Sequence, residues 1–346
     1  MKKVLIAIAV IIMCAASAHA GSNELYLYIW SEYIPDEVLE DFTKETGITV
    51  HLSTYDSNEA MYAKIKLAGQ GYDLIVPSSD YVGLMRRQEM LLPLDKAKLP
   101  NLSNLTPRFV NQSFDPNNEY SVPYMWGSTA IAINTGTLGH TAVESIADLW
   151  KPEMDGRLLL PNEPREAFVL ALKKLGYSVN ETDPAHLEEA YQQLKILMPR
   201  VRAFDSDSPK QALLSGEISV GVVWNGEAYI ANSENPEIIY LYPPEGFSLW
   251  MDSMCIPKGA KNIAEAHVFL NYLLRPDVAA VISTEMGYST PNAKAIELLP
   301  EEVRNNPIVY PSEAEIQRGE FEDDLGEAMK LYDEYWVKLK TGNTQP

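Results

Sequence analysis

The sequence predicts an α/β protein folded as two lobes, each with a mainly parallel sheet flanked by helices. Strand-like and helix-like runs alternate over the first eighty residues, and the alternation returns between residues 158 and 223. Such alternation favours parallel strands joined by right-handed crossovers. The chain has 346 residues, and this length favours two cores over one.

The first part of the chain predicts three strands separated by two helices. Gly47 ends the first helix and Ser57 caps the second. The expected order is strand 24–29, helix 35–46, strand 48–52, helix 57–68 and strand 73–76. Ligands bind such sheets beyond the carboxyl ends of the strands, so residues 30–33 and 78–81 are expected at a binding rim.

The second lobe is expected to repeat this pattern. Its predicted elements are strand 158–160, helix 165–175 ended by Gly176, helix 184–198, strand 218–223 and a long amphipathic helix at 320–340 that packs on the lobe. Chain crossings are expected near residues 129–134 and 252–257. The expected division is therefore a leader at 1–20, one lobe from 21–132 plus 254–305, and the other from 133–253 plus 306–346.

The N-terminus predicts a cleavable secretory signal and a periplasmic protein. Lys2 and Lys3 precede a short apolar run, and Ala18-His19-Ala20 forms a small-residue cleavage site. The run is too short for a membrane span. Cys14 raises the alternative of a lipid anchor, but Met13 before it is bulkier than the residue a lipobox carries there.

Composition narrows the possible partners. Removal of the leader, which carries two lysines and no acid, takes the net charge from −20 to −22, and such a surface repels nucleic acid and attracts small cations. Cys255 is then the sole cysteine, so no internal disulfide is expected. The histidines are too scattered for a zinc site, and no cofactor is expected.

Aromatic residues beside acids predict an organic cation as ligand. Trp250 and Asp252 form one such pair, Trp30 and Glu32 another, and Trp224 closes an apolar strand. An aromatic ring attracts an ammonium by about 0.5 to 2 kcal/mol, and a carboxylate makes its burial tolerable. Each tryptophan could instead be a core residue. Trp126, Trp150 and Trp336 are expected to be structural.

Catalytic signatures are sparse. The sequence lacks G-x-S-x-G, a phosphate-binding glycine loop, H-E-x-x-H and C-x-x-C. Glu163 and Glu166 could serve as the acid and base of an exported glycoside hydrolase, with the aromatics as sugar platforms. At a helix start, however, such residues more often cap the helix or pair with a neighbour such as Arg165. We therefore expect a binding protein rather than an enzyme, with another cation or a sugar as alternative ligands.

Six motifs in order resemble the periplasmic spermidine/putrescine-binding proteins of polyamine ABC importers. They lie at residues 30–35, 42–47, 72–78, 148–152, 224–226 and 250–253. The resemblance runs from about residue 24 to about 340. It implies a two-lobed periplasmic binding protein fold that closes over an extended polyamine, and delivery to an inner-membrane permease. We expect the protein to be a monomer.

The resemblance also implies a ligand site. Aromatic walls match Trp30, Tyr33, Trp224, Trp250 and Tyr288. Amine-binding acids match Glu32, Glu166 and Asp252, polar contacts match Ser31 and Ser78, and Glu163 replaces an aspartate with a longer acid.

Two positions depart from the family pattern. Asp80 stands where the family has a ligand-facing tyrosine, and Glu322 stands where it has a pocket glutamine. Each change adds a possible anion, so a cation with an extra or differently placed amine could satisfy both. Alternatively, Asp80 caps the helix that begins there and leaves Tyr81 to pack. The sequence does not choose between spermidine and putrescine.

Overall fold

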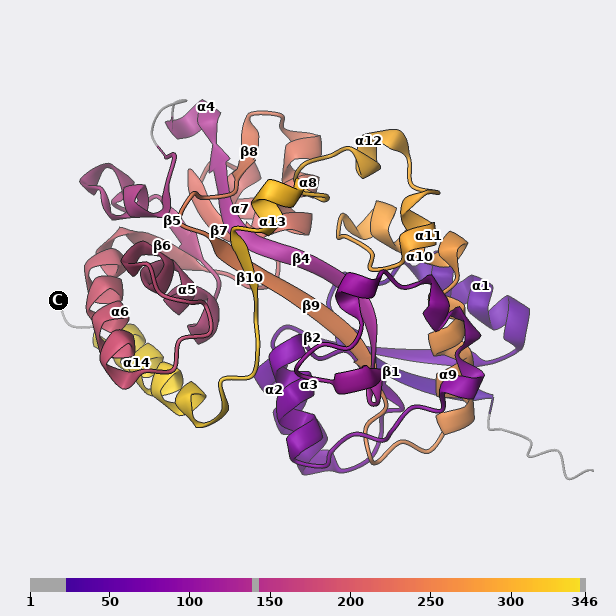
Figure 1. Ribbon diagram of the computed structural model, residues 1–346. Helices are drawn as coiled ribbons and strands as arrows, with labels where there is room; N and C mark the ends of the chain where they lie inside the picture. The colour runs from indigo at the N-terminus through magenta and orange to yellow at the C-terminus, as the bar shows by residue number, and fades with distance from the viewer. Residues whose placement is uncertain (1–22, 139–142, 343–346) are drawn as a thin grey trace, which may run out of the picture.

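The computed structural model describes residues 23–138 and 143–342 and has the α/β architecture that the sequence predicts (Figure 1). Its strands are β1 (Glu24–Trp30), β2 (Thr49–Tyr55), β3 (Leu74–Ile75), β4 (Ser121–Asn134), β5 (Leu158–Leu160), β6 (Val201–Phe204), β7 (Val220–Trp224), β8 (Ile238–Leu241), β9 (Phe247–Cys255) and β10 (Gly319–Phe321). The predicted leader lies outside the described residues.

The helices alternate with these strands, and short 3-10 turns fill several connections. They are α1 (Asp36–Thr46), α2 (Asn58–Ala68), α3 (Ser79–Arg87), α4 (Thr135–Leu138), α5 (Pro164–Leu175), α6 (Pro184–Leu197), α7 (Lys210–Leu214), α8 (Asn225–Glu234), α9 (Ile263–Leu273), α10 (Pro276–Met286), α11 (Ala293–Ile296), α12 (Glu301–Arg304), α13 (Glu313–Ile316) and α14 (Met329–Gly342). Gly47 and Gly176 end α1 and α5 in the left-handed conformation, as expected from sequence.

The strands form one curled sheet in the order β2-β1-β3-β9-β4-β7-β5-β6, with β10 on β9 and β8 on β4. The pairs β1 with β2, β1 with β3, β5 with β6 and β5 with β7 are parallel, as strand-helix-strand alternation requires. The long strands β4 and β9 run antiparallel to each other and connect the two halves (Figure 1). The halves are therefore joined by hydrogen-bonded strands.

Each half has its own hydrophobic core. Phe42 and Phe269 are fully buried in the core around β1, whereas Phe168 and Tyr332 are fully buried in the core around β5. Helices α1, α9 and α10 lie on one half, and α5, α6 and α14 lie on the other (Figure 1). This arrangement confirms a two-lobed fold. The residues at which the chain divides between the lobes stay a prediction.

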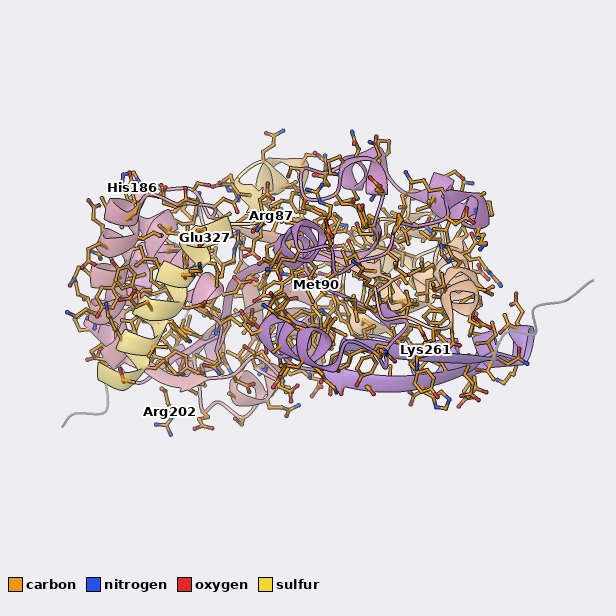
Figure 2. All side chains as sticks on the ribbon, turned by 90° about the horizontal axis from the view of Figure 1, so that it is seen from below. Arg87, Met90, His186, Arg202, Lys261 and Glu327 are labelled. Atoms are coloured by element: carbon orange, nitrogen blue, oxygen red, sulfur yellow. The ribbon has the colours of Figure 1, made fainter. Side chains whose placement is uncertain are left out.

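The lobes also touch away from the sheet. Arg87, at the end of α3, pairs with Asp324 from the segment that precedes α14. Seen from below, Arg87 and Glu327 lie close together where the lobes meet (Figure 2). The C-terminal segment therefore contacts the N-terminal lobe before it returns to its own.

The long helix predicted at 320–340 is wrong in its first third. Glu320 lies in β10, which pairs with β9, and its carboxylate accepts hydrogen bonds from Lys173 and Ser178. Residues 322–325 lie outside any helix or strand, Gly326–Ala328 form a 3-10 turn, and α14 begins only at Met329. The helix packs on α5 and α6, as expected of a structural element.

Within the two described stretches, no helix combines the length and the apolar character that crossing a bilayer requires.

Candidate functional site

A cleft between the lobes brings every predicted site residue together. It encloses about 890 Å³ of empty space, including solvent at its mouth. Its lining contains all of the residues marked from sequence: Trp30, Ser31, Glu32, Tyr33, Ser78, Asp80, Glu163, Glu166, Trp224, Trp250, Asp252, Tyr288 and Glu322. Most of the residues come from the ends of β1, β3, β5 and β7 and from the middle of β9, whereas Tyr288 follows α10 and Glu322 follows β10. The carboxyl-end rule therefore locates most of the site.

Asp252 is a buried carboxylate with only neutral hydrogen-bond partners. Its Oδ1 accepts a hydrogen bond of 2.6 Å from the Ser78 hydroxyl, and its Oδ2 accepts one of 2.7 Å from the Tyr33 phenol. Asn58 in turn donates to Ser78 at 3.0 Å. Burial raises the pKa of Asp252 to about 7, against the lowering effect of these two hydrogen bonds. The carboxylate is thus held in place, and its charge has no cation among the described residues.

Aromatic rings form the walls around this carboxylate. Trp250 and Tyr288 meet edge to face with centroids 5.4 Å apart, and Tyr33 meets Tyr288 in the same way at 5.4 Å. The Trp30 indole donates to the Val76 carbonyl at 2.8 Å, which fixes its ring. Trp30 and Trp224 are half-buried at the cleft. Trp250 and Tyr288 belong to the hydrophobic core and also line the cleft, so the two sequence alternatives apply together.

Two glycines permit this close packing. A methyl group on Gly226, in the first turn of α8, would overlap the Tyr288 ring. A methyl group on Gly127, in β4, would overlap the Asn225 amide and the Trp250 ring. These glycines allow the backbone to approach the aromatic walls.

Glu163 and Glu166 start α5 and point buried oxygens at the cleft. Glu166 accepts a hydrogen bond of 2.7 Å from Thr129 through Oε1, and its Oε2 has no partner in the described structure. Glu163 occupies the N-cap position, but its side chain makes no capping hydrogen bond, and its Oε1 is also buried without a described partner. Burial raises the pKa of both carboxyls well above the usual range. The expectation that they cap the helix or pair with Arg165 is therefore wrong.

Arg165 pairs instead with the two residues that depart from the family pattern. Its Nη1 lies 3.6 Å from Asp80 Oδ2, and its Nε lies 3.4 Å from Glu322 Oε1. Asp80 is not the cap of α3, because Ser78 holds that position. Glu322 also accepts a hydrogen bond of 2.7 Å from Ser248. Both added acids are thus partly neutralised by a cation of the protein.

Lys210 is a functional candidate that the sequence did not reveal. It begins α7, its side chain is 8% exposed, and its Nζ lies 2.9 Å from Glu32 Oε2 and 3.0 Å from Glu227 Oε1. Although burial lowers it, the charges of Glu227 and Glu32 raise the pKa of Lys210 overall. The position of Lys210 shortly after strand β6 could have indicated a place near the cleft. However, β6 is half-exposed and lacks the apolar pattern by which a strand is predicted from sequence.

Comparisons with known proteins agree with the architecture of the cleft. Residues 37–311 match the family model described as bacterial extracellular solute-binding protein. The spermidine/putrescine-binding periplasmic protein of Salmonella typhimurium is 50% identical over 94% of each chain. A putrescine-binding periplasmic protein of Pseudomonas aeruginosa is 34% identical over 98% of each chain.

Solved structures show the same fold. The substrate-binding protein of a spermidine/putrescine ABC transporter from Streptococcus pneumoniae aligns with a TM-score of 0.80 and 39% identity, covering 92% of this chain and 98% of that one. A lipoprotein of Treponema pallidum aligns with a TM-score of 0.82 and 29% identity, covering 91% and 99%. On these grounds, the chain belongs to the family of bacterial extracellular solute-binding proteins.

Proposed function

We propose that this protein is the periplasmic substrate-binding component of a polyamine ABC importer. It captures spermidine or putrescine between its lobes and presents the closed form to an inner-membrane permease. The observation that carries the proposal is Asp252, a carboxylate buried among aromatic rings and held by two hydroxyl groups, without a cation in the described structure. A buried anion of this kind is stabilised by a ligand cation.

The surrounding walls suit the hydrocarbon part of such a ligand. Trp30, Trp224, Trp250 and Tyr288 present rings to the cleft. Each methylene they cover contributes on the order of 0.8 kcal/mol, and each ring also attracts an ammonium by about 0.5 to 2 kcal/mol. Glu163 and Glu166 supply a second anionic position through their unpartnered oxygens. A flexible amine therefore fits both the charges and the apolar surface.

Among the residues that the structure describes, nine acids line the cleft, with Arg165 as the single basic residue. This excess of negative charge favours a ligand with more than one positive charge. The relatives named above carry polyamines in their names, and their periplasmic location supports the same location for this chain. We further propose that the protein acts as a monomer without a cofactor and does not bind nucleic acid.

A calorimetric and thermal-shift screen tests the proposal. The purified exported form is titrated with putrescine, cadaverine, spermidine, lysine and maltose, since a ligand that binds the folded state raises the melting temperature. We expect stabilisation by at least one di- or triamine at millimolar concentration or below, and none by maltose. A response to maltose alone, or to no amine, would contradict the proposal.

A further inference from the structure

Seven acids of the cleft divide into two kinds according to the cation that each one faces, and the other two, Glu59 and Asp207, are exposed. Glu32 and Glu227 face Lys210. Asp80 and Glu322 face Arg165 in the same manner. Asp252, Glu163 and Glu166 form no ion pair with any described residue within 4.0 Å, and the latter two have buried oxygens without a hydrogen-bond partner.

The ion pair between Lys210 and Glu227 is buried and is not a surface contact. The lysine side chain is 8% exposed and the Glu227 side chain 9%, so their ion pair is largely removed from water. Glu32 reaches it from the other lobe, from a backbone φ of 50° that a glutamate adopts only at a cost of about 1 kcal/mol or more. The lysine ammonium therefore lies behind the cleft lining at the Glu32 end, between two lining acids that come from different lobes.

Hydrogen bonds and packing contacts link these groups in order along the cleft. Gly226, next to Glu227, packs against the Tyr288 ring, which meets the Tyr33 ring, and the Tyr33 phenol donates to Oδ2 of Asp252. The other oxygen of Asp252 accepts from Ser78, and the adjacent Ser79 donates to the Glu322 carbonyl. Asp252 therefore lies between the Lys210 group and the group around Arg165 in this chain of contacts.

We propose that Lys210 occupies the ammonium position at the Glu32 end of the cleft, so that the site selects a linear diamine over a triamine. This inference rests on the proposed function and names its ligand class. Among the buried acids of the described cleft, the two positions left for a ligand are Asp252 and the Glu163–Glu166 pair. A third ammonium that extended past Asp252 toward Glu32 would meet the ammonium of Lys210.

The physical reason is competition for the same carboxylate. Glu32 can neutralise one buried ammonium, and Lys210 already holds its Oε2 at 2.9 Å. A triamine must either leave its third charge unpaired or displace the lysine, and both alternatives lower its affinity relative to a diamine. Substitution of Lys210 by a neutral residue frees Glu32 and Glu227 for the third ammonium.

The test is the ratio of two affinities in the full exported chain, measured by calorimetry with putrescine and spermidine. The Lys210→Met variant keeps the aliphatic stem and removes the charge. We expect the ratio of spermidine affinity to putrescine affinity to rise by about tenfold, equivalent to one desolvated charge contact. The Lys210→Arg variant, which restores the positive charge, is expected to return the ratio toward that of the unmodified protein.

Lys210 also joins the two lobes, so its substitution could weaken the binding of every ligand by impairing closure of the cleft. The ratio of the two affinities distinguishes such a general loss from a change in preference between diamine and triamine. If Lys210→Met weakens both ligands equally, or leaves the ratio unchanged, Lys210 is only a contact between lobes and the inference is wrong. If the methionine variant does not fold, Lys210→Gln is used, since it keeps length and hydrogen bonding to Glu227. An unmodified protein that binds neither amine contradicts the proposed function instead.

Discussion

Asp252 and Glu32 line the same cleft, but only Glu32 is paired with a cation among the described residues. Asp252 is buried and accepts hydrogen bonds only from hydroxyl groups, so its charge is available to a ligand. The side chain of Glu32 is 68% exposed and already holds the ammonium of Lys210. The difference shows that the acids in a binding cleft cannot be counted as equivalent ligand contacts. We expect those without an internal cation to bind the ligand, and those with one to maintain the shape of the cleft.

The largest expected effect comes from removal of an internal cation. Arg165→Met leaves Asp80 and Glu322 buried beside each other without a positive charge, so we expect a loss of about 3 kcal/mol in the free energy of unfolding. Urea denaturation at neutral pH measures it. Arg275→Met is the matched control, because Arg275 is paired at the surface and its loss should cost less than about 1 kcal/mol. Equal losses would remove the distinction between the two kinds of acid.

Removal of an acid that lacks an internal cation should affect binding instead. Asp252→Asn is expected to weaken polyamine binding by at least about tenfold, or 1.4 kcal/mol, because a ligand ammonium loses its buried counter-charge. The ligand-free melting temperature should stay the same or rise, since burial of this charge opposes folding. Calorimetry and thermal unfolding measure both quantities. Glu32→Gln should cause a smaller loss of affinity, and the reverse ranking would contradict the comparison.

The walls of the cleft give a third test. Gly226→Ala forces its methyl group against the Tyr288 ring, and relief of that overlap displaces the wall beside Asp252. We expect polyamine affinity to fall by about fivefold, consistent with overpacking costs of roughly 1 to 3 kcal/mol. Gly342→Ala serves as control, because nothing lies within 4 Å of its position. Unchanged affinity in Gly226→Ala would show that the Tyr288 wall does not contact the ligand.

The smallest expected effect is a pH dependence of binding. With its pKa raised to about 7, Asp252 is partly protonated in the ligand-free protein, and an ammonium ligand favours the ionised form. Affinity should therefore rise by about threefold between about pH 6.5 and about pH 7.5, with proton release on binding. Calorimetry in buffers of different ionisation enthalpy detects the protons, and Asp252→Asn should reduce their number.

The raised pKa of Asp252 also affects how the free energy of unfolding depends on pH. The folded ligand-free protein holds a proton on Asp252 that the unfolded chain has lost, so the contribution of this carboxyl to stability falls as pH rises from about 4 to about 7. Urea denaturation of the unmodified protein and of Asp252→Asn isolates this contribution, because all other titrating groups are common to both. A stability difference that shifted in favour of the unmodified protein as pH rose would contradict the buried, cation-free state of the carboxylate.

The strand-end rule, which depends only on local pattern, predicted that residues 30–33 and 78–81 lie at the cleft, whereas Tyr288 and Glu322 were predicted only from the family resemblance. Neither of them predicted how the acids are paired. Arg165 neighbours Glu163 and Glu166 along the chain but pairs with Asp80 and Glu322, which are remote in sequence. Lys210 meets Glu32 across 178 positions. Such contacts depend on how the lobes pack against each other, and the hydrophobic periodicity of the sequence does not predict them.

The C-terminal segment shows a different limit. Residues 320–328 have helical composition, yet Glu320 lies in a strand because β9 offers an open edge there. Tertiary pairing overrides local propensity at this point, which single-sequence patterns cannot anticipate.

The continuous sheet constrains how the molecule can move. Because β4 and β9 pass between the lobes as paired strands rather than as loose linkers, opening requires torsion spread along both strands while their interstrand hydrogen bonds persist. Amide protons along residues 121–129 and 248–255 should then exchange slowly with solvent whether or not ligand is present. The paired strands therefore make a continuous hinge, and side-chain contacts such as Lys210 with Glu32 and Arg87 with Asp324 join the lobes elsewhere.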